Sequence, residues 1–566
     1  MRYNVMYKTQ MNDVVYQIWP RSFKDSDGDG IGDLQGIISK LDYLQSLGIK
    51  TIWLCPVYVS PNIDYGYDIS DYYNIQPEFG TMADMDQLIH EAKNRGIGIL
   101  MDLVANHTSS EHPWFKQALA DPHSKYRDYY FFQEGKNGKE PNNWISVFGG
   151  PAWTKSNRDN EYYLTMFSPQ QVDLNWKNPA VRQEIYKIMT FWMSKGIAGF
   201  RMDVINIIAK AEGLPDKDPH KKGLQFAGDL IVSQPMSHEY LREMYEEVMS
   251  KYPGLYLGEG MIVNKDSCAQ YCGFDRKELD MMFHFDLALI GCGPLGKYDF
   301  TKLYHWTISD FKNIFTKWNV AAYENKFWMG NFLSNHDNGR SVSRFGDEKR
   351  FRVQSQKALL VSTMTAYGTP FIYQGEEIGM TNMKIDEKDW EDFEAISDFK
   401  MLKQMFHLPR FIRLYVIQKM TRDNARTIMQ WDSGEHAGFS TKKPWYLINP
   451  NHKEINVKDD LEDKDSSLNF TKELIAYHQA HSALRSGSFK PVMESHKQIL
   501  AYLREDENEK LMVLINLDNK PAMFKADDYQ EMRTQLCNYS TYGPMDKKMV
   551  FRPYEARIVK LVSQNP

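Results

Sequence analysis

The 566-residue sequence has few cysteines, no long apolar run and little charge imbalance, and each absence excludes a class of protein. The five cysteines are an odd number, and only Cys268 and Cys272 are close, which predicts buried thiols rather than disulfides or a zinc site. No run approaches the roughly 18–20 apolar residues of a membrane span, and no signal-peptide stretch opens the chain, so we expect a cytoplasmic protein without membrane contact. The 68 Lys and Arg against 74 Asp and Glu leave no basic footprint for nucleic acid.

The composition is that of a large globular protein. Hydrophobic residues make up 42%, charged residues 25% and aromatic residues 13% of the chain. The length suits several domains, or one barrel with insertions and an added domain. The aromatic side chains predict either a large core or stacking surfaces for sugars or bases, and composition does not choose between them.

Short β-rich runs alternate with helical patterns over the first 380 residues. This alternation predicts an α/β protein built on a (β/α)8 TIM barrel rather than on an open sheet. The eight expected strands are Val14–Trp19, Thr51–Leu54, Gly98–Val104, Ile197–Asp203, Leu255–Glu259, Met281–Asp286, Phe327–Leu333 and Pro370–Gln374.

Uneven spacing between these runs predicts the domain organisation. The barrel is expected to take residues 1–105 and 177–485, with an excursion at about 381–464. The long turn-prone segment 106–176 is expected to form an inserted lid domain, domain B, after the third strand. Period-two patterns predict a C-terminal antiparallel β-domain over 486–566.

Four carboxylates lie at or near the ends of predicted strands: Asp102, Asp203, Glu259 and Asp337. Catalytic groups of such barrels gather at the C-terminal ends of the strands. A lone acid in an apolar strand is usually a satisfied structural residue, because an unpaired buried charge is costly. Four at matching positions favour a catalytic site.

Ordered motifs surround these carboxylates: DLVANH at 102–107, QVDLNW at 171–176, GFRMDV at 199–204, GE at 258–259 and NHD at 335–337. With them the chain resembles glycoside hydrolase family 13, the α-amylase family, and most closely its oligo-1,6-glucosidase and dextran glucosidase branch. The resemblance implies a retaining glycosidase, which needs a carboxylate nucleophile and a nearby carboxylic acid. It implies Asp203 as nucleophile, Glu259 as acid and base with a raised pKa, and Asp337 as the third carboxylate.

The resemblance also implies a set of glucose-binding residues: Asp64, Tyr67, His107, Phe167, Gln171, Arg201 and His336. Arg201 is expected to keep Asp203 ionised, and Tyr67 to stack on the sugar. An arginine of the RDNART segment is expected to pair with Asp64 and close the pocket. We assign it to Arg426, with Arg422 as the alternative. A closed pocket predicts an exo-acting enzyme that releases one glucose at a time.

The residue after the nucleophile is Val204, which in this branch is typical of α-1,6-specific enzymes. We therefore expect hydrolysis of isomaltose, isomalto-oligosaccharides and related short α-glucosides, since such a contact is worth about 1–3 kcal/mol. Val147 and Met261 depart from the branch pattern, and they are expected near the leaving group.

An aspartate-rich segment follows the first strand, with Asp25, Asp27, Asp29, Ile31 and Asp33 as the expected ligands. Alternating carboxylates and a backbone carbonyl suit Ca²⁺, although this is not an EF-hand. The resemblance implies a structural Ca²⁺, or Mg²⁺, and no organic cofactor. The alternative is an acidic turn without metal.

Other activities remain open within the family. The alternatives are a trehalose-6-phosphate hydrolase, an α-glucosidase acting on α-1,4 bonds or on sucrose-type substrates, and a sucrose isomerase, whose arginine-rich loop is missing here. A transporter subunit of this fold is disfavoured because the catalytic carboxylates are present. The expected partner is a small oligosaccharide, and a monomer is the default assembly.

Overall fold

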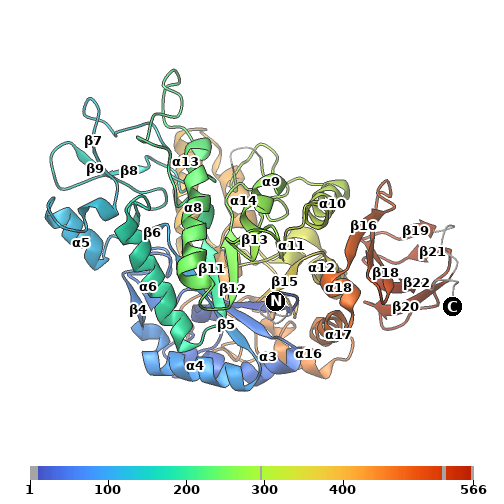
Figure 1. Ribbon diagram of the computed structural model, residues 1–566. Helices are drawn as coiled ribbons and strands as arrows, with labels where there is room; N and C mark the ends of the chain where they lie inside the picture. The colour runs from blue at the N-terminus through green and yellow to red at the C-terminus, as the bar shows by residue number, and fades with distance from the viewer. Residues whose placement is uncertain (1–10, 294–295, 526–530, 562–566) are drawn as a thin grey trace.

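The computed structural model describes residues 11–293, 296–525 and 531–561 and centres on an eight-stranded parallel sheet (Figure 1). The order β13-β12-β11-β5-β2-β1-β15-β14 is joined at its ends by a parallel bridge between Met282 and Met329, so the sheet curls into a nearly closed barrel. All eight predicted strands are present. Their bounds are β1 Val15–Ile18, β2 Thr51–Leu54, β5 Gly98–Val104, β11 Gly199–Asp203, β12 Leu255–Glu259, β13 Met281–Phe283, β14 Gly330–Asn331 and β15 Thr369–Tyr373.

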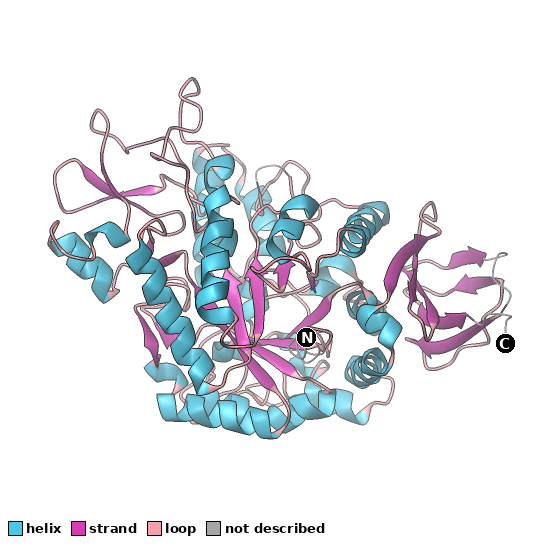
Figure 2. Cartoon of the chain, in the orientation of Figure 1, coloured by secondary structure: helices cyan, strands magenta, loops and turns pink. Residues whose placement is uncertain are grey.

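Helices surround the strands, as the cyan and magenta elements of Figure 2 show. Local signals fix their ends: Thr81 forms a capping box with Asp84 at the start of α4, and α6 stops at Gly196 in the left-handed conformation. The helices of this layer are α2 Leu34–Ile38, α3 Leu41–Leu47, α4 Met82–Asn94, α6 Pro179–Lys195, α7 Gly228–Ile231, α8 Pro235–Met244, α9 Lys265–Cys272, α10 Ile308–Glu324, α11 Ser341–Phe345 and α12 Arg352–Thr365.

A long insertion follows β5, at the left of Figure 1. It holds β6 His107–Ser109, α5 Pro113–Ala120, β7 Phe132–Glu134, β8 Trp153–Lys155, β9 Glu161–Leu164 and β10 Gln171–Asp173. Its core of Trp144, Trp153 and Phe167 extends to Val204, directly after β11. The insertion therefore packs against the chain beside the expected nucleophile. A smaller hairpin, β3 Tyr58–Val59 with β4 Asp71–Ile75, lies after β2.

The segment after β15 contains α13 Phe393–Gln404, α14 Arg410–Met420, α15 Asp423–Arg426, α16 Val457–Glu462, α17 Ser467–Ala480 and α18 Ser482–Ser486. An antiparallel sheet, β16-β17-β18-β22-β20, and the pair β19-β21 complete the chain. Their bounds are β16 Ser488–Val492, β17 Ile499–Glu505, β18 Lys510–Asn516, β19 Ala522–Lys525, β20 Met532–Cys537, β21 Lys548–Phe551 and β22 Ala556–Leu561. Buried Arg504 joins this sheet to the barrel by donating to the Thr365 carbonyl at 2.7 Å.

The architecture confirms the predicted barrel with an insertion after its third strand and a C-terminal antiparallel β-domain. The residue boundaries drawn between these parts stay predictions. All five cysteines are free thiols, and Cys268 and Cys272 are buried. In the part of the chain that is described, no helix combines the length and apolarity needed to traverse a bilayer.

Candidate active site

A cavity of about 250 Å³ opens where the barrel strands end at their carboxyl termini. Asp203 and Glu259 are the last residues of β11 and β12, and His336 and Asp337 follow β14. The other residues that line it are Asp64, Tyr67, His107, Val147, Phe148, Phe167, Gln171, Val204, Met261, Ile262, Phe285, Leu289, Lys297, Asn338, Glu394 and Arg422. The structure thus brings the three predicted catalytic carboxylates into one cavity.

Arg201 joins the carboxylates beneath this cavity. It lies two residues before Asp203 in β11, so both side chains point to the same side of the strand. One guanidinium nitrogen contacts Asp102 and lies 3.0 Å from Asp203, while the other contacts Glu259. Asp102 also accepts from the Trp53 indole at 2.8 Å. A single buried cation therefore fixes the positions of the candidate nucleophile and the candidate acid.

The protonation of Asp203 follows from its burial. Burial and the carboxylates of Asp337 and Asp64 raise the pKa of Asp203 to about 6, while Arg201 opposes the rise. With that pKa, Asp203 is mostly ionised at pH 7 by a small margin, and Arg201 favours the ionised form. The raised pKa expected for Glu259 stays a prediction. The positive charge of Arg201 beside Glu259 acts against such a rise.

The pKa of Asp337 is shifted in the opposite direction from that of Asp203. Burial would raise its pKa, but His336, Arg422 and Arg426 together hold the pKa of Asp337 well below its usual range. The His336 ring lies between Trp19 and Tyr67, at centroid distances of 5.6 and 5.2 Å. Burial lowers the pKa of His336 to about 3. A neutral histidine beside a permanently ionised aspartate suits the binding of sugar hydroxyls.

The floor of the cavity corrects one prediction. Arg422, not Arg426, pairs with Asp64, at 3.1 Å between Nη1 and Oδ1. The two arginines are four residues apart across one helical turn, so both reach the same side, and each lies 3.6 Å from Asp337. Asp392 holds Arg422 at 2.8 Å, whereas Arg426 stacks over Trp19 at 4.5 Å. The sequence spacing does not show which of the two arginines pairs with Asp64. Asp392, which holds Arg422 in place, belongs to no recognisable motif.

The remaining predicted sugar-binding residues also reach the cavity. Gln171, at the start of β10, donates to Asp64 at 3.2 Å. His107, at the start of β6, contacts the Tyr67 carbonyl through Nε2 at 3.0 Å, and burial lowers its pKa. Phe167 packs against His107, with ring centroids 5.1 Å apart. The insertion therefore supplies one wall of the cavity, at the end where Asp64 and Arg422 lie.

The opposite end of the cavity is mostly apolar. Val204 has a left-handed backbone, with φ of 36°, which is strained for a β-branched residue. Sequence reasoning missed four residues that line the cavity. They are Phe285 and Leu289 after β13, Asn338 directly after the NHD motif, and Glu394 in the first turn of α13. Lys297, a candidate anion anchor in the sequence, lies 3.2 Å from Glu394. Lys265, the other candidate, begins α9 and does not line the cavity.

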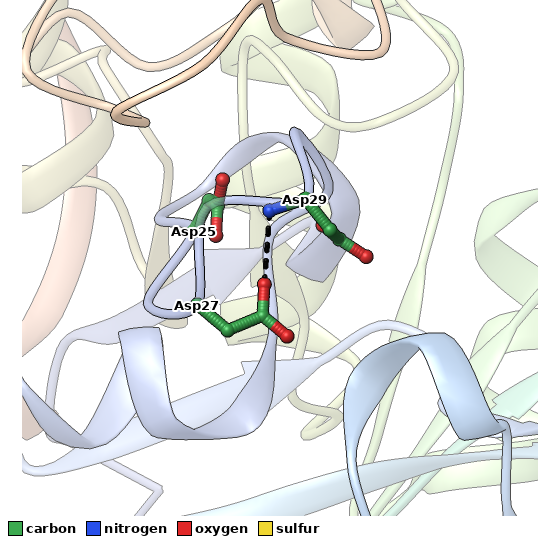
Figure 3. A group of neighbouring side chains, drawn as sticks. All are labelled: Asp25, Asp27 and Asp29. Atoms are coloured by element: carbon green, nitrogen blue, oxygen red, sulfur yellow. Dashed lines mark hydrogen bonds between the residues drawn. The ribbon is translucent and has the colours of Figure 1, made fainter.

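The aspartate-rich loop lies apart from this cavity and is shown in Figure 3. Carboxylate oxygens of Asp25, Asp27 and Asp29 lie within 4.8 Å of one another, as a shared cation requires. Asp33 is not part of this group. Its carboxylate accepts instead from Ser26 at 2.7 Å and from the Gly36 amide at the start of α2.

Comparisons with known proteins agree with this geometry. Residues 17–487 match the alpha amylase catalytic domain. An oligo-1,6-glucosidase of Parageobacillus thermoglucosidasius is 46% identical, covering 97% of this chain and 98% of its own, and a trehalose-6-phosphate hydrolase of Bacillus subtilis is 40% identical, covering 97% of each. The crystal structure of isomaltulose synthase from Klebsiella sp. LX3 superposes with a TM-score of 0.93 at 38% identity, covering 99% of this chain and all of its own. The chain belongs to glycoside hydrolase family 13, the α-amylase family.

Proposed function

We propose that the protein is a retaining, exo-acting α-glucosidase that hydrolyses terminal α-1,6 bonds of isomaltose, isomalto-oligosaccharides and related short α-glucosides. The observation that carries this proposal is the pairing of Asp203 and Glu259 with one guanidinium, that of Arg201, inside a cavity whose floor is closed by Asp64 and Arg422. Asp203 and Glu259 contact the two terminal nitrogens of the same guanidinium. This arrangement suits the separation of about 5–5.5 Å between the two carboxyl groups of retaining enzymes.

The chemistry follows from the two carboxyl groups. Ionised Asp203 attacks the anomeric carbon, and Glu259 in its acid form protonates the departing glycosidic oxygen. Glu259 then accepts a proton from water, which releases glucose from Asp203 with the original configuration. Because Arg201 favours ionised Glu259, this role requires substrate to displace part of that contact. Asp337 stabilises the positive charge that develops on the sugar ring.

The closed floor supports release of single glucose units. Asp64 accepts from both Arg422 and Gln171, so charged and polar groups block the cavity beyond the non-reducing sugar. A chain cannot pass through such a floor. Release of maltose or longer units from oligosaccharides as first products would contradict this proposal.

The alternative of a phosphorylated substrate finds less support in the cavity. Its lining cations, Lys297 and Arg422, are both engaged by carboxylates. A phosphate on the aglycone would need a free cationic anchor. One experiment separates the activities: initial rates on isomaltose, maltose, trehalose, trehalose 6-phosphate and sucrose, measured side by side. We expect isomaltose to be hydrolysed fastest, and faster turnover of any other substrate would reject the assigned linkage.

We also propose a structural Ca²⁺, or Mg²⁺, at Asp25, Asp27 and Asp29. Three carboxylates held together without a cationic side chain among them match the all-oxygen ligands that Ca²⁺ prefers. The Ile31 carbonyl is the next donor in the loop. Asp33 lies outside the group of three and caps α2, so its direct contact with the ion stays a prediction.

A further inference from the structure

A second cavity of about 120 Å³ lies behind one wall of the active-site cavity. It is formed by the loop after β13 together with α11 and α14, both labelled in Figure 1. Its walls include Tyr304, Trp306, Ser343, Arg344, Tyr415 and Lys419. A single water needs only about 10–15 Å³ of such space, so the cavity has room for a group of several heavy atoms.

The cavity carries uncompensated positive charge. Arg344 and Lys419 line it and no carboxylate does. Across residues 11–293, 296–525 and 531–561, neither cation forms an ion pair with Asp or Glu, and burial lowers the pKa of Arg344 to about 10. Lys419 is exposed to solvent, but a cation as enclosed as Arg344 is usually paired, so its lack of an acidic partner requires an explanation.

Arg344 also has an unused donor. Its Nη2 donates to the Ala288 carbonyl, but its buried Nη1 has no hydrogen-bond partner. Nearly all buried polar atoms in proteins are satisfied, and an orphaned one indicates a missing partner. Ser343 lies beside it, and because its oxygen accepts from the Asn382 amide at 2.8 Å, its hydroxyl proton remains free to donate.

Aromatic side chains form part of the walls, and one wall segment has a strained backbone. Trp306 and the half-exposed Tyr415 supply flat surfaces on which a sugar ring could stack. Leu303 and Tyr304 are consecutive non-glycine residues with positive φ, at 48° and 58°. Such conformations are costly and persist where the surrounding structure requires them, often at ligand sites.

We propose that this second cavity binds a phosphate group, either as inorganic phosphate or as the phosphate of a hexose phosphate. Its doubly charged, oxygen-rich surface matches two cations, a free guanidinium nitrogen and a hydroxyl donor. The site is distinct from the active-site cavity, where Lys297 is paired with Glu394 close to Arg422.

The second cavity shares a wall with the first. Arg344 donates to the Ala288 carbonyl and Tyr304 donates to the Lys297 carbonyl at 2.8 Å. Leu289 and Lys297, in the same segment, line the active-site cavity. A phosphate bound to Arg344 would therefore contact the other side of a segment that lines the active-site cavity.

Isothermal titration calorimetry of the full-length protein, which measures the Kd of each ligand, tests this proposal. Inorganic phosphate and glucose 6-phosphate are titrated separately, with glucose as the blank for the active-site cavity. We expect binding in the unmodified protein, and binding at least about tenfold weaker in Lys419→Gln and in Arg344→Gln, because each loses a charge-assisted contact. Lys403 is exposed on α13. The variant Lys403→Gln is the matched control, and it should bind phosphate as tightly as the unmodified protein does.

The two ligands distinguish the sources of the phosphate. Tighter binding of glucose 6-phosphate than of inorganic phosphate assigns the aromatic walls to a sugar ring, and equal binding assigns the site to free phosphate. Lys419 is exposed, so its variant tests the site even if the Arg344 variant fails to fold. No binding of either ligand, or equal binding in Lys419→Gln, would overturn the proposal.

Discussion

The two ends of the active-site cavity are built on different physical principles. At the end expected to bind glucose, Asp64, Arg422 and Asp337 form contacts between charged groups. Asp64 and Asp337 lie in turns after β3 and β14, and Arg422 directly precedes the short helix α15. At the aglycone end, Met261, Phe285 and other apolar side chains lie on loops and form few specific hydrogen bonds. Directional, charge-assisted contacts recognise one sugar strictly, whereas apolar contacts discriminate by only about 1–3 kcal/mol for each group.

The two ends should therefore differ in how strictly they select the part of the substrate that they contact. Removing one partner of a buried charge pair leaves the other unpaired, which costs about 2–5 kcal/mol. Changing an apolar rim residue alters shape without stranding a charge. The enzyme should therefore tolerate changes of aglycone far better than changes of the terminal glucose.

The largest effect is expected for Asp203→Ala, at the centre of the charged end. Removing the nucleophile should lower kcat by at least about 10⁴-fold, since no other group is placed to form the covalent intermediate. Hydrolysis of p-nitrophenyl α-glucoside measures the loss. Asp86→Ala, which breaks only a surface pair with Lys195, should retain full activity. Substantial turnover in Asp203→Ala would refute the assigned nucleophile.

Arg422 and Arg426 provide the next test. Arg422→Lys should lower kcat/KM for isomaltose by about 10²-fold, because it breaks a buried pair with Asp64. Arg426→Lys keeps its charge near Asp337 and should lose less than about tenfold. Steady-state kinetics of both variants measures the two losses in kcat/KM. Equal losses would mean that the two arginines share the floor.

The pH dependence separates the two ends directly. Since the pKa of Asp203 is raised to about 6, kcat/KM should fall as the pH drops through 6, because the protonated carboxyl is not a nucleophile. Below that point the fall should be about tenfold per pH unit, with an apparent pKa shared among the coupled carboxylates. Met261→Leu, at the apolar end, should keep the same acid limb. An acid limb near pH 4 would show that burial has little effect on Asp203.

The barrel was predictable from sequence because its signal is local. Strands such as Gly98–Val104 are short apolar runs, and the helices between them carry caps such as Thr81. The meeting of Asp203, Glu259 and Asp337 in one cavity was predictable because strand ends converge in this fold. The partner of Asp64 was not, because two arginines one helical turn apart compete for it and the deciding contact, Asp392, comes from a distant loop.

Val204 tests the boundary between the two ends. Val204→Ala removes two methyl groups from a residue that packs between the insertion and the nucleophile, and it should shift the ratio of isomaltose to maltose turnover by about tenfold toward maltose. Competition between the two disaccharides in one reaction measures the ratio. Ile262→Ala, at the exposed rim, should change it by less. An unchanged ratio in Val204→Ala would remove this side chain from the linkage argument.

The smallest effect on catalysis is expected from the acidic loop, which touches neither end. None of Asp25, Asp27 and Asp29 lines the cavity, so chelation should leave kcat unchanged at moderate temperature. It should lower Tm by at least about 2 °C, because an ion that binds only the folded state stabilises it. Asp27→Asn should show the lower Tm with or without chelator. A Tm that does not respond to chelation would identify the loop as a metal-free turn, held by Ser26, Gly36 and the hydrogen bonds already formed among its own residues.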